Sequence, residues 1–345
     1  MNVCTTSRPW PDSGTECVLR STVSFGGTQA MGGITVTGPS DLAHPLISVC
    51  VCTYRRPDLL QSLLQSLTAQ RSDSFDVEIV VVDNDPLGSA QAVVEKARAA
   101  HPHHRVNYDI EPEQGISYAR NRAVSLAKGD IIAFIDDDEL PSEHWLASLL
   151  ATMRETRADA VLGPVLPDFP HGSPRWSAAC GCFDRPRHRT GDPVPANEGR
   201  TGNAIVRAHW LRARAPFEPR FALTGGEDYA FFRTISGQGA VLIWCDEATV
   251  SELVPLDRQR FRWVLERALR GSMTFWRINA VPCSPHRKAI RVAIGAAAGF
   301  AFAALGLALL PFGRHLAARY WSKAAKAIGR VLAVSSYNIE TYRHR

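Results

Sequence analysis

The segment EQGISYARNRAVSLAKGDIIAFIDDDELP, at residues 113–141, decides the expected fold, because it joins a helix, a buried strand and a cluster of carboxylates. Residues 116–127 have the apolar spacing of a helix, and residues 130–136 form a continuous apolar run that predicts a strand. Three consecutive aspartates, at 136–138, end this strand. Strands that are apolar on both faces are typical of a parallel sheet covered by helices on both sides.

The same unit of strand, loop and helix recurs along the first half of the chain. Strands are predicted at 46–52, 77–83, 106–110 and 130–136, and helices begin at Pro57, near 88, near 116 and at Ser142. Further strands are predicted at 158–166 and 240–245, whereas the Pro-, Gly-, His- and Arg-rich residues 167–200 predict a mobile loop. This alternation predicts an α/β fold with a mostly parallel central sheet, in which ligands bind beyond the carboxyl ends of the strands.

Composition narrows the class of protein. The 345 residues, 45% hydrophobic and 21% charged, predict a globular protein and exclude a collagen repeat, a small disulfide scaffold or disorder throughout. Residues 1–44, rich in Ser, Thr and Gly, predict a disordered N-terminal extension. Cys50 and Cys52 alternate inside an apolar run and no signal peptide opens the chain, so we expect a reduced, cytosolic compartment.

Polar clusters follow three of the predicted strands, as TYRRP at 53–57, DNDP at 83–86 and DDDE at 136–139. A nucleotide needs hydrogen-bonding groups for its base, a partner for its ribose and a cation for its diphosphate, and this edge of the sheet offers all three. The sequence has no GxGxxG after the first strand and no GxxxxGK[ST], which argues against a dinucleotide-binding Rossmann fold and a P-loop.

Two acidic segments are candidates for chemistry. The aspartates at 136–138 offer oxygen ligands of the kind that Mg²⁺ and Mn²⁺ select, although a solvated acidic turn is the alternative. Adjacent carboxylates repel one another unless a cation compensates them. In TGGED, at 224–228, the glycines allow close approach of a ligand, but carboxylates also stabilise a helix start. Capping and catalysis therefore both remain open for TGGED.

Together, and in this order, these segments resemble the family 2 glycosyltransferases, inverting enzymes of the GT-A fold that use nucleotide-diphosphate sugars. The resemblance covers roughly residues 46–275, through ISVCVCTYRRPDLL, VEIVVVDNDP, the segment at 113–141, GNAIVR and TGGEDYAFF. Within the family, the chain is most similar to enzymes that build bacterial surface polysaccharides. The resemblance implies metal-dependent transfer of a sugar from a nucleotide-diphosphate sugar to a glycan or lipid-linked acceptor.

The resemblance also implies roles for individual residues. Asp228 takes the position of the catalytic base, which removes the proton of the acceptor hydroxyl. Asp136 and Asp138 form the pair that binds Mn²⁺ or Mg²⁺, with Asp138 the direct ligand and Asp136 nearer the ribose. The implied nucleotide-sugar contacts are Thr53, Tyr54, Arg55, Asp83, Asn84, Gly115, Arg120, Asp136 and Asp137. The implied acceptor contacts are Glu227, Asn203, Arg262 and Trp263.

Arg262 and Trp263 lie in QRFRW, at 259–263, which resembles the acceptor-gate motif of processive polysaccharide synthases. Those synthases continue into several membrane spans, whereas this chain has one apolar stretch, so processivity does not follow. A basic amphipathic helix is the alternative interpretation of this segment.

The C-terminal part is basic and contains an uncharged apolar stretch. Of the 39 Lys and Arg, 16 fall at 255–345, with only three of the 34 Asp and Glu. The apolar stretch, at 292–310, is just long enough to cross a membrane as a helix. Both of its flanks are basic, and a single crossing would export one flank against the positive-inside bias. A re-entrant or interfacial segment, or packing on the catalytic domain, resolves the conflict.

A basic stripe follows the apolar stretch. Arg319, Lys323, Lys326 and Arg330 recur at helical spacing, which predicts a helix lying on an anionic leaflet, with an ordinary surface helix as the alternative. We therefore expect an extension at 1–44, a GT-A domain at 45–275 and a basic, membrane-associating helical tail at 276–345. The expected location is the cytosolic face of the inner (cell) membrane, with the membrane surface and no nucleic acid as partner.

Two other functions are compatible with parts of the pattern. A nucleotidyltransferase acting on sugar phosphates would share the nucleotide-binding sheet and the paired metal carboxylates. A catalytically idle membrane scaffold of polysaccharide assembly would share the tail. The presence of Asp136, Asp138 and Asp228 together counts against the scaffold.

Overall fold

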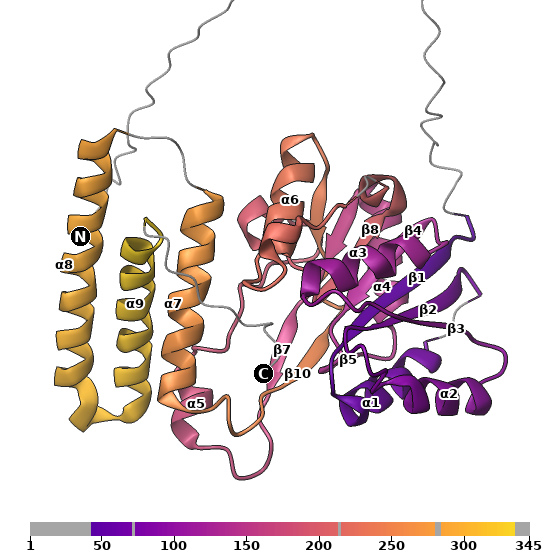
Figure 1. Ribbon diagram of the computed structural model, residues 1–345, viewed down its shortest axis with the longest axis horizontal. Coiled ribbons are helices and arrows are strands. Elements are labelled where there is room, and N and C mark those ends of the chain that lie inside the picture. Colours follow the sequence, from indigo (N-terminus) through magenta and orange to yellow (C-terminus); the bar gives the residue numbers. More distant parts are fainter. Residues whose placement is uncertain (1–42, 71–72, 213–214, 280–283, 335–345) are drawn as a thin grey trace, which may run out of the picture. The chain divides into compact units, whose positions relative to one another are not determined.

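The computed structural model describes residues 43–70, 73–212, 215–279 and 284–334, and they all fall in one compact unit. The predicted N-terminal extension at 1–44 therefore lies almost entirely outside the described residues. The fold is mixed α/β, with helices on both faces of a central sheet and a group of long helices at the C-terminal end (Figure 1).

A seven-stranded sheet, in the order β3-β2-β1-β4-β8-β6-β9, forms the centre. Its strands are β1 (Leu46–Thr53), β2 (Asp76–Asp83), β3 (Arg105–Ile110), β4 (Ile131–Ile135), β6 (Ala160–Leu162), β8 (Asn203–Arg207) and β9 (Leu242–Trp244). Neighbours pair in parallel except around β8, which is antiparallel to both β4 and β6. The prediction of a mostly parallel central sheet is confirmed, and the antiparallel strand β8 was not predicted.

A second, three-stranded sheet has the order β5-β10-β7. Its strands are β5 (Glu139–Pro141), β7 (Val165–Asp168) and β10 (Val250–Leu253). The prediction of one strand at 158–166 was wrong, because β6 joins the large sheet and β7 the small one. The chain leaves the large sheet at Gly163, where an added Cβ would lie 2.5 Å from the Ala248 carbonyl oxygen, and at Pro164, which has no N–H to donate.

Apolar side chains form a separate core on each face of the large sheet. One face packs against α1 (Pro57–Thr68), α2 (Gln91–Ala100) and α4 (Trp145–Thr156), and the other against α3 (Ile116–Leu126) and α6 (Glu227–Gly237). Strand β1 serves both cores, since Val49 and Val51 belong to the first and Cys50 to the second. The continuous apolar run in the sequence thus reflects burial on both faces.

Three long helices form the C-terminal part, drawn in orange to yellow in Figure 1. They are α7 (Phe261–Ile278), α8 (Pro285–Leu309) and α9 (Arg314–Leu332), and α9 packs against both α7 and α8. Small buried residues of α9, such as Ala317, Ala318 and Ala325, allow this close packing. The domain boundary predicted at residue 275 falls inside α7.

Residues 167–200, predicted as a mobile loop, contain helix α5 (Arg175–Ala179) and pack against the C-terminal helices. Phe183 is buried in a cluster with residues of α7 and α9, and Trp176 stacks on Phe261 with 4.2 Å between ring centroids. The aromatic residues of this segment thus pack it against the C-terminal helices.

Candidate functional site

The carboxyl ends of the neighbouring strands β1 and β4 meet at one edge of the large sheet, which places Thr53 beside the three aspartates. Thr53 Oγ1 donates a hydrogen bond to Asp137 Oδ2 at 2.8 Å, and Arg56 Nη1 donates to Asp137 Oδ1 at 2.9 Å. Burial raises the pKa of Asp137 to about 6, although Arg56 opposes the shift. Asp137 thus ties the loop after β1 to the end of β4.

Asp138 lies between two arginines. Its Oδ2 accepts from Arg56 Nη1 at 3.3 Å and from Arg258 Nη2 at 3.1 Å. The pKa of Asp138 is nevertheless raised, because burial and the negative charge of Asp136 outweigh the two guanidinium groups. Asp138 thus keeps a raised pKa although it pairs with two arginines.

Arg120, a buried residue of α3, connects the two acidic segments of the sequence. Its Nη2 donates to Asp136 Oδ1 at 3.0 Å, and its Nη1 donates to Glu227 at the start of α6. The Asp136 side chain remains 42% exposed, whereas Glu227 is buried. Burial raises the pKa of Glu227 to about 7, and Arg120 offsets part of that shift.

Asp228 follows Glu227 on α6 and is partly exposed. Gly226 caps this helix with φ +98°, and a Cβ there would lie 2.3 Å from Thr274 Cγ2 of α7, so α6 begins in direct contact with α7. A second contact follows three residues later, since Asn279 Nδ2, just beyond α7, donates to the Tyr229 hydroxyl. The position of Asp228 therefore depends on α7.

Two adjoining cavities open at this edge. The first, of about 490 Å³, contains among its lining residues Thr53, Tyr54, Asn84, Arg120, Asp136, Asp137, Asp138 and Trp263. The second, of about 320 Å³, contains among its lining residues Arg120, Asp136, Thr224, Glu227 and Asp228. Since Arg120 and Asp136 line both, the structure brings most of the predicted site residues to one place.

Asn203, predicted to contact an acceptor, lines neither cavity. It is buried in β8, where Nδ2 donates to the carbonyl oxygens of Pro164 at 3.0 Å and Ala248 at 2.7 Å. Its Oδ1 accepts from Trp145 Nε1 at 2.8 Å. The amide is therefore engaged with β-strand ends and α4, and an acceptor would have to displace one of these bonds.

Asp83 also lies outside both cavities and is fully buried. Its Oδ2 accepts from the Ala90 backbone N–H at 2.7 Å and from the Tyr108 hydroxyl at 3.2 Å, and its Oδ1 accepts from the Asp85 N–H at 2.9 Å. The side chain thereby holds the loop between β2 and α2. Contact with a nucleotide stays a prediction for Asp83.

Asn84 and Gly115 act together. The Asn84 amide donates to the backbone carbonyls of Glu111 and Glu113, and its Oδ1 accepts from Gly115 N–H at 2.9 Å. Gly115 has φ +133°, and a Cβ there would lie 2.6 Å from the Cβ of Ala222, so the start of α3 requires glycine. Asn84 lines the first cavity, and Gly115 lines neither cavity.

Two arginines that were predicted to contact substrates, Arg55 and Arg262, do not line either cavity. Arg55, in the left-handed region at φ +54°, pairs with Asp85 at 3.2 Å. Arg262 is 88% exposed on α7 and pairs with Glu266 one turn along. Neither lines the two cavities, whereas the neighbouring Trp263 lines the first.

The prediction gave no role to Glu139, Arg56 or Arg258. Glu139 is buried, and its Oε2 accepts from the Asp136 backbone N–H at 3.0 Å, which shapes the turn that presents the aspartates. The sequence did carry a signal for two of them, because Glu139 is the fourth acid of DDDE and Arg56 is the second arginine of TYRRP. Arg258, which is distant in sequence, carried no such signal.

The fit of a divalent metal rests on two carboxylates. Within the described residues, no group of three or more His, Cys, Asp or Glu side chains is arranged to hold a metal. Mg²⁺ is commonly held by one or two carboxylates together with substrate phosphates, so Asp136 and Asp138 have the right donor chemistry for an ion that binds with a diphosphate. Arg56 and Arg258 would compete with that ion for Asp138.

Comparison with known proteins decides the family. A family model described as "Glycosyl transferase family 2" matches residues 48–207, which include Thr53 and the three aspartates. The succinoglycan biosynthesis protein ExoM of Rhizobium meliloti is 37% identical over 268 residues, which are 76% of this chain and 84% of that protein. The chain belongs to glycosyltransferase family 2. The family predicted from the motifs is thus confirmed, and this family 2 glycosyltransferase is an enzyme.

A second curated relative and a solved structure are also similar to this glycosyltransferase. Glycosyltransferase AglE of Haloferax volcanii is 28% identical over 185 residues, which are 53% of this chain and 59% of that protein. The mannosyltransferase PcManGT of Pyrobaculum calidifontis, solved with GDP-Man and Mn²⁺, aligns with a TM-score of 0.54 at 23% identity, covering 85% of this chain and 87% of that one. This structural likeness confirms the GT-A fold.

Proposed function

We propose that this glycosyltransferase moves one sugar from a nucleotide-diphosphate sugar to a hydroxyl of a glycan or lipid-linked acceptor, with inversion, in surface polysaccharide synthesis. The observation that carries the proposal is Arg120, which bonds to Asp136 and to Glu227 and so joins the two cavities at one point. The similarity to ExoM, a succinoglycan biosynthesis protein, supports a role in polysaccharide synthesis. The GDP-Man bound by PcManGT supports the class of donor.

In this mechanism the first cavity receives the nucleoside diphosphate and the second receives the acceptor. The acceptor oxygen attacks the anomeric carbon from the face opposite the diphosphate, and a new carbon–oxygen bond forms. The bond from that carbon to the diphosphate oxygen breaks, and its electron pair leaves with the nucleoside diphosphate. Asp228, a partly exposed carboxylate of the second cavity, accepts the hydroxyl proton.

The surrounding residues orient these groups. Arg120 holds Asp136 between the cavities, and Glu139 fixes the backbone of Asp136. A divalent ion held by Asp138 and Asp136 would neutralise charge on the leaving diphosphate. Arg56 and Arg258, beside Asp138, add positive charge at the same end of the first cavity.

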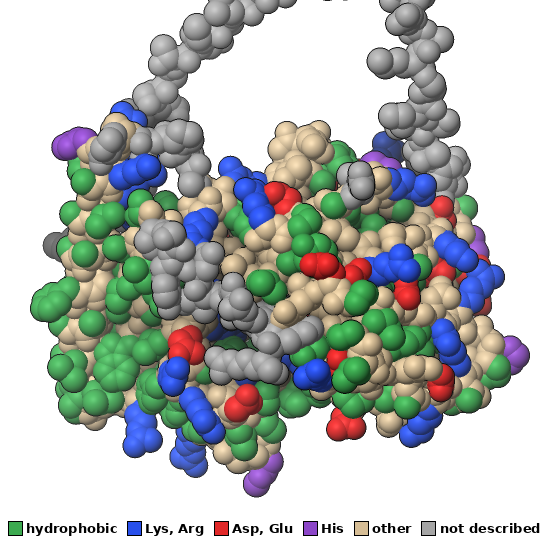
Figure 2. Space-filling view, in the orientation of Figure 1, with side chains coloured by type: hydrophobic (Ala, Val, Ile, Leu, Met, Phe, Trp, Pro, Cys, Tyr) green, Lys and Arg blue, Asp and Glu red, His purple; other side chains and the backbone are tan. Residues whose placement is uncertain are grey.

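We also propose that the enzyme works at the cytosolic face of the cell membrane. One segment of the described chain, His286–Phe312, is by length and composition apolar enough to cross a membrane, and only 17% of its apolar window is buried. Hydrophobic side chains gather over this helix in Figure 2, and Phe300 and Phe312 are 79% and 75% exposed. This exposure supports contact with lipid.

Incubating the protein with a panel of nucleotide-sugars, Mn²⁺ or Mg²⁺ and a membrane lipid extract tests the proposal. Release of nucleoside diphosphate that depends on the extract is the expected result. Release of pyrophosphate would instead support a nucleotidyltransferase, and no turnover with any donor would support an idle scaffold. The Asp228→Asn variant, which keeps the shape of the side chain, is the matched control.

A further inference from the structure

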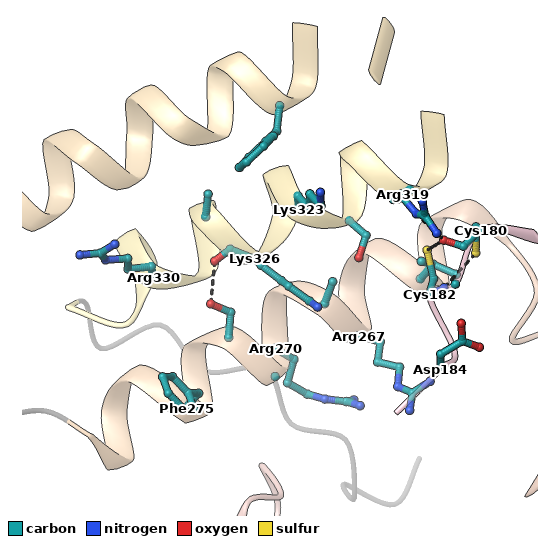
Figure 3. A pocket seen from close by; sticks show the side chains of 18 of the residues that line it. Cys180, Cys182, Asp184, Arg267, Arg270, Phe275, Arg319, Lys323, Lys326 and Arg330 are labelled. Atoms are coloured by element: carbon teal, nitrogen blue, oxygen red, sulfur yellow. Dashed lines mark hydrogen bonds between the residues drawn. The ribbon is translucent and has the colours of Figure 1, made fainter. Parts of the chain in front are cut away.

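A third cavity, of about 1030 Å³, lies between α7, α8, α9 and the segment at 180–185 (Figure 3). Among the described residues that line it are eight Arg or Lys side chains and one carboxylate, Asp184. Apolar side chains, including Trp276 and Phe302, complete the lining. No step of the proposed sugar transfer uses this cavity.

Several of these cations have no carboxylate partner. Among the described residues, Arg267, Lys323 and Lys326 form no ion pair with Asp or Glu. Arg267 lies over the Trp263 ring, 5.4 Å from its centroid, and Lys323 lies over the Tyr320 ring at 4.8 Å. Burial, with the positive charge of neighbouring arginines, lowers the pKa of Arg267 to about 10. The cavity thus has a surplus of positive charge that an anion would neutralise.

The basic stripe of α9 contributes half of these cations. The four residues Arg319, Lys323, Lys326 and Arg330 all line this cavity, and their contact with a leaflet stays a prediction. In Figure 3, Lys326 extends from α9 toward α7. The charge of α9 therefore lies beside α7 and α8.

The cavity adjoins both cavities of the sugar-transfer site. Trp263, Arg267 and Arg270 also line the first of them, and Arg200 and Arg270 also line the second, which contains Asp228. A ligand whose anionic part lies in the third cavity can therefore place another part beside Asp228.

Helix α8 supplies an apolar surface next to this positive charge. Gly295, Ala298 and Phe302 of α8 line the cavity, while Phe300 and Leu307 are 79% and 65% exposed. Positive charge beside an exposed apolar helix fits a ligand that is both anionic and lipidic. A soluble anion would account for the charge but not for the apolar surface.

We propose that the third cavity binds the phosphate or diphosphate group of a lipid-linked acceptor, whose hydrocarbon chain lies along α8 and whose sugar enters the second cavity. Guanidinium and ammonium groups are the side chains that bind phosphate most strongly. The entry of the sugar into the second cavity rests on the proposed function, whereas the binding of a lipid phosphate in the third cavity does not require sugar transfer.

Flotation with three kinds of vesicle tests the binding. The vesicles contain phosphatidylcholine alone, phosphatidylcholine with phosphatidylglycerol, or phosphatidylcholine with a polyprenyl diphosphate at equal total charge. We expect the protein to prefer the polyprenyl diphosphate. Lys326→Gln should weaken that binding about fivefold, and Lys323→Gln together with Lys326→Gln should weaken it further. Lys288→Gln, on the exposed start of α8, is the matched control and should leave the preference unchanged.

Three results would overturn the proposal. Equal binding to both anionic vesicles would show only a general attraction to membranes. Inorganic pyrophosphate that binds as tightly as the lipid would show a site for a soluble anion. Variants that weaken nucleoside diphosphate binding instead would assign the cavity to the donor.

Kinetics separate this proposal from the proposed function. If both are right, Lys326→Gln raises the KM for a polyprenyl diphosphate-linked sugar and leaves kcat and the donor KM unchanged. An unchanged acceptor KM in an active enzyme would overturn the cavity assignment alone. Selective lipid diphosphate binding without turnover with any donor would overturn the sugar transfer and leave the cavity assignment in place.

Discussion

Arginine has opposite surroundings in two regions of this molecule. At the edge formed by β1 and β4, Arg56 and Arg120 bind carboxylates and so hold the aspartate turn in place. In the C-terminal helices, Arg267 lines a cavity and forms no ion pair with Asp or Glu among the described residues. At the sheet edge the arginines orient the protein's own carboxylates, whereas in the C-terminal cavity positive charge is available for a ligand. The residue type is shared, and the contacts decide the role.

The largest effect is expected from the catalytic edge. Asp228→Asn keeps the shape of the side chain but removes the proton acceptor, so turnover should fall by about 10²–10⁴ with donor affinity nearly unchanged. Nucleotide release and calorimetry with the donor measure the two quantities. Equal turnover in the variant would move the base to another residue, and Glu227→Gln would then be the next variant to assay.

Asp138→Ala should lower metal-dependent donor affinity by about 10–100-fold, because the ion would lose its proposed direct ligand. Calorimetry with donor, with and without Mn²⁺, measures the loss. Asp109→Ala, on β3 and outside both cavities, is the control and should bind as the unaltered protein does. If donor binding to Asp138→Ala still depends on Mn²⁺ as in the unaltered protein, Asp138 does not bind the metal and serves only in the internal ion pairs at this edge of the sheet.

Asn203→Ala distinguishes a structural residue from an acceptor contact. Loss of this amide leaves Trp145 Nε1 and two buried carbonyls without their partner, so the free energy of unfolding should fall by about 3 kcal/mol. Chemical denaturation measures it. Normal stability with a raised acceptor KM would restore the role that the sequence predicted.

A smaller effect should appear in the pH dependence of stability. Burial raises the pKa of Glu227 from 4.5 to about 7, against the pull of Arg120 and with the repulsion of Asp228 and Asp136. The folded chain then holds this proton more tightly than the unfolded chain does. The stabilisation is complete below the unfolded pKa of about 4.5 and is lost progressively as pH rises through about 7.

Urea unfolding across this pH range measures the effect. Glu227→Gln should flatten the profile, whereas Glu266→Gln, an exposed control on α7, should keep it. Parallel profiles for Glu227→Gln and the unaltered chain would show that Glu227 does not titrate across this pH range.

The sequence predicted what depends on local pattern. Continuous apolar strands such as β1 and β4 and the polar residues after them placed Thr53 and the aspartates at one edge correctly. The partners of Asn203 could not be predicted, because Trp145 and Ala248 lie far away in sequence and meet it only through the antiparallel strand β8. Helical periodicity likewise identified the basic face of α9, but it cannot say what that face contacts.

The contact between α6 and α7 makes the tail a mechanical part of the catalytic unit. Gly226 abuts Thr274, and Ile278 and Asn279 bind Arg233 and Tyr229 on α6. A chain cut at residue 275 to improve solubility would lose the last two anchors of the helix that carries Asp228. Any displacement of α7 would therefore be transmitted through these contacts to the helix that carries Asp228.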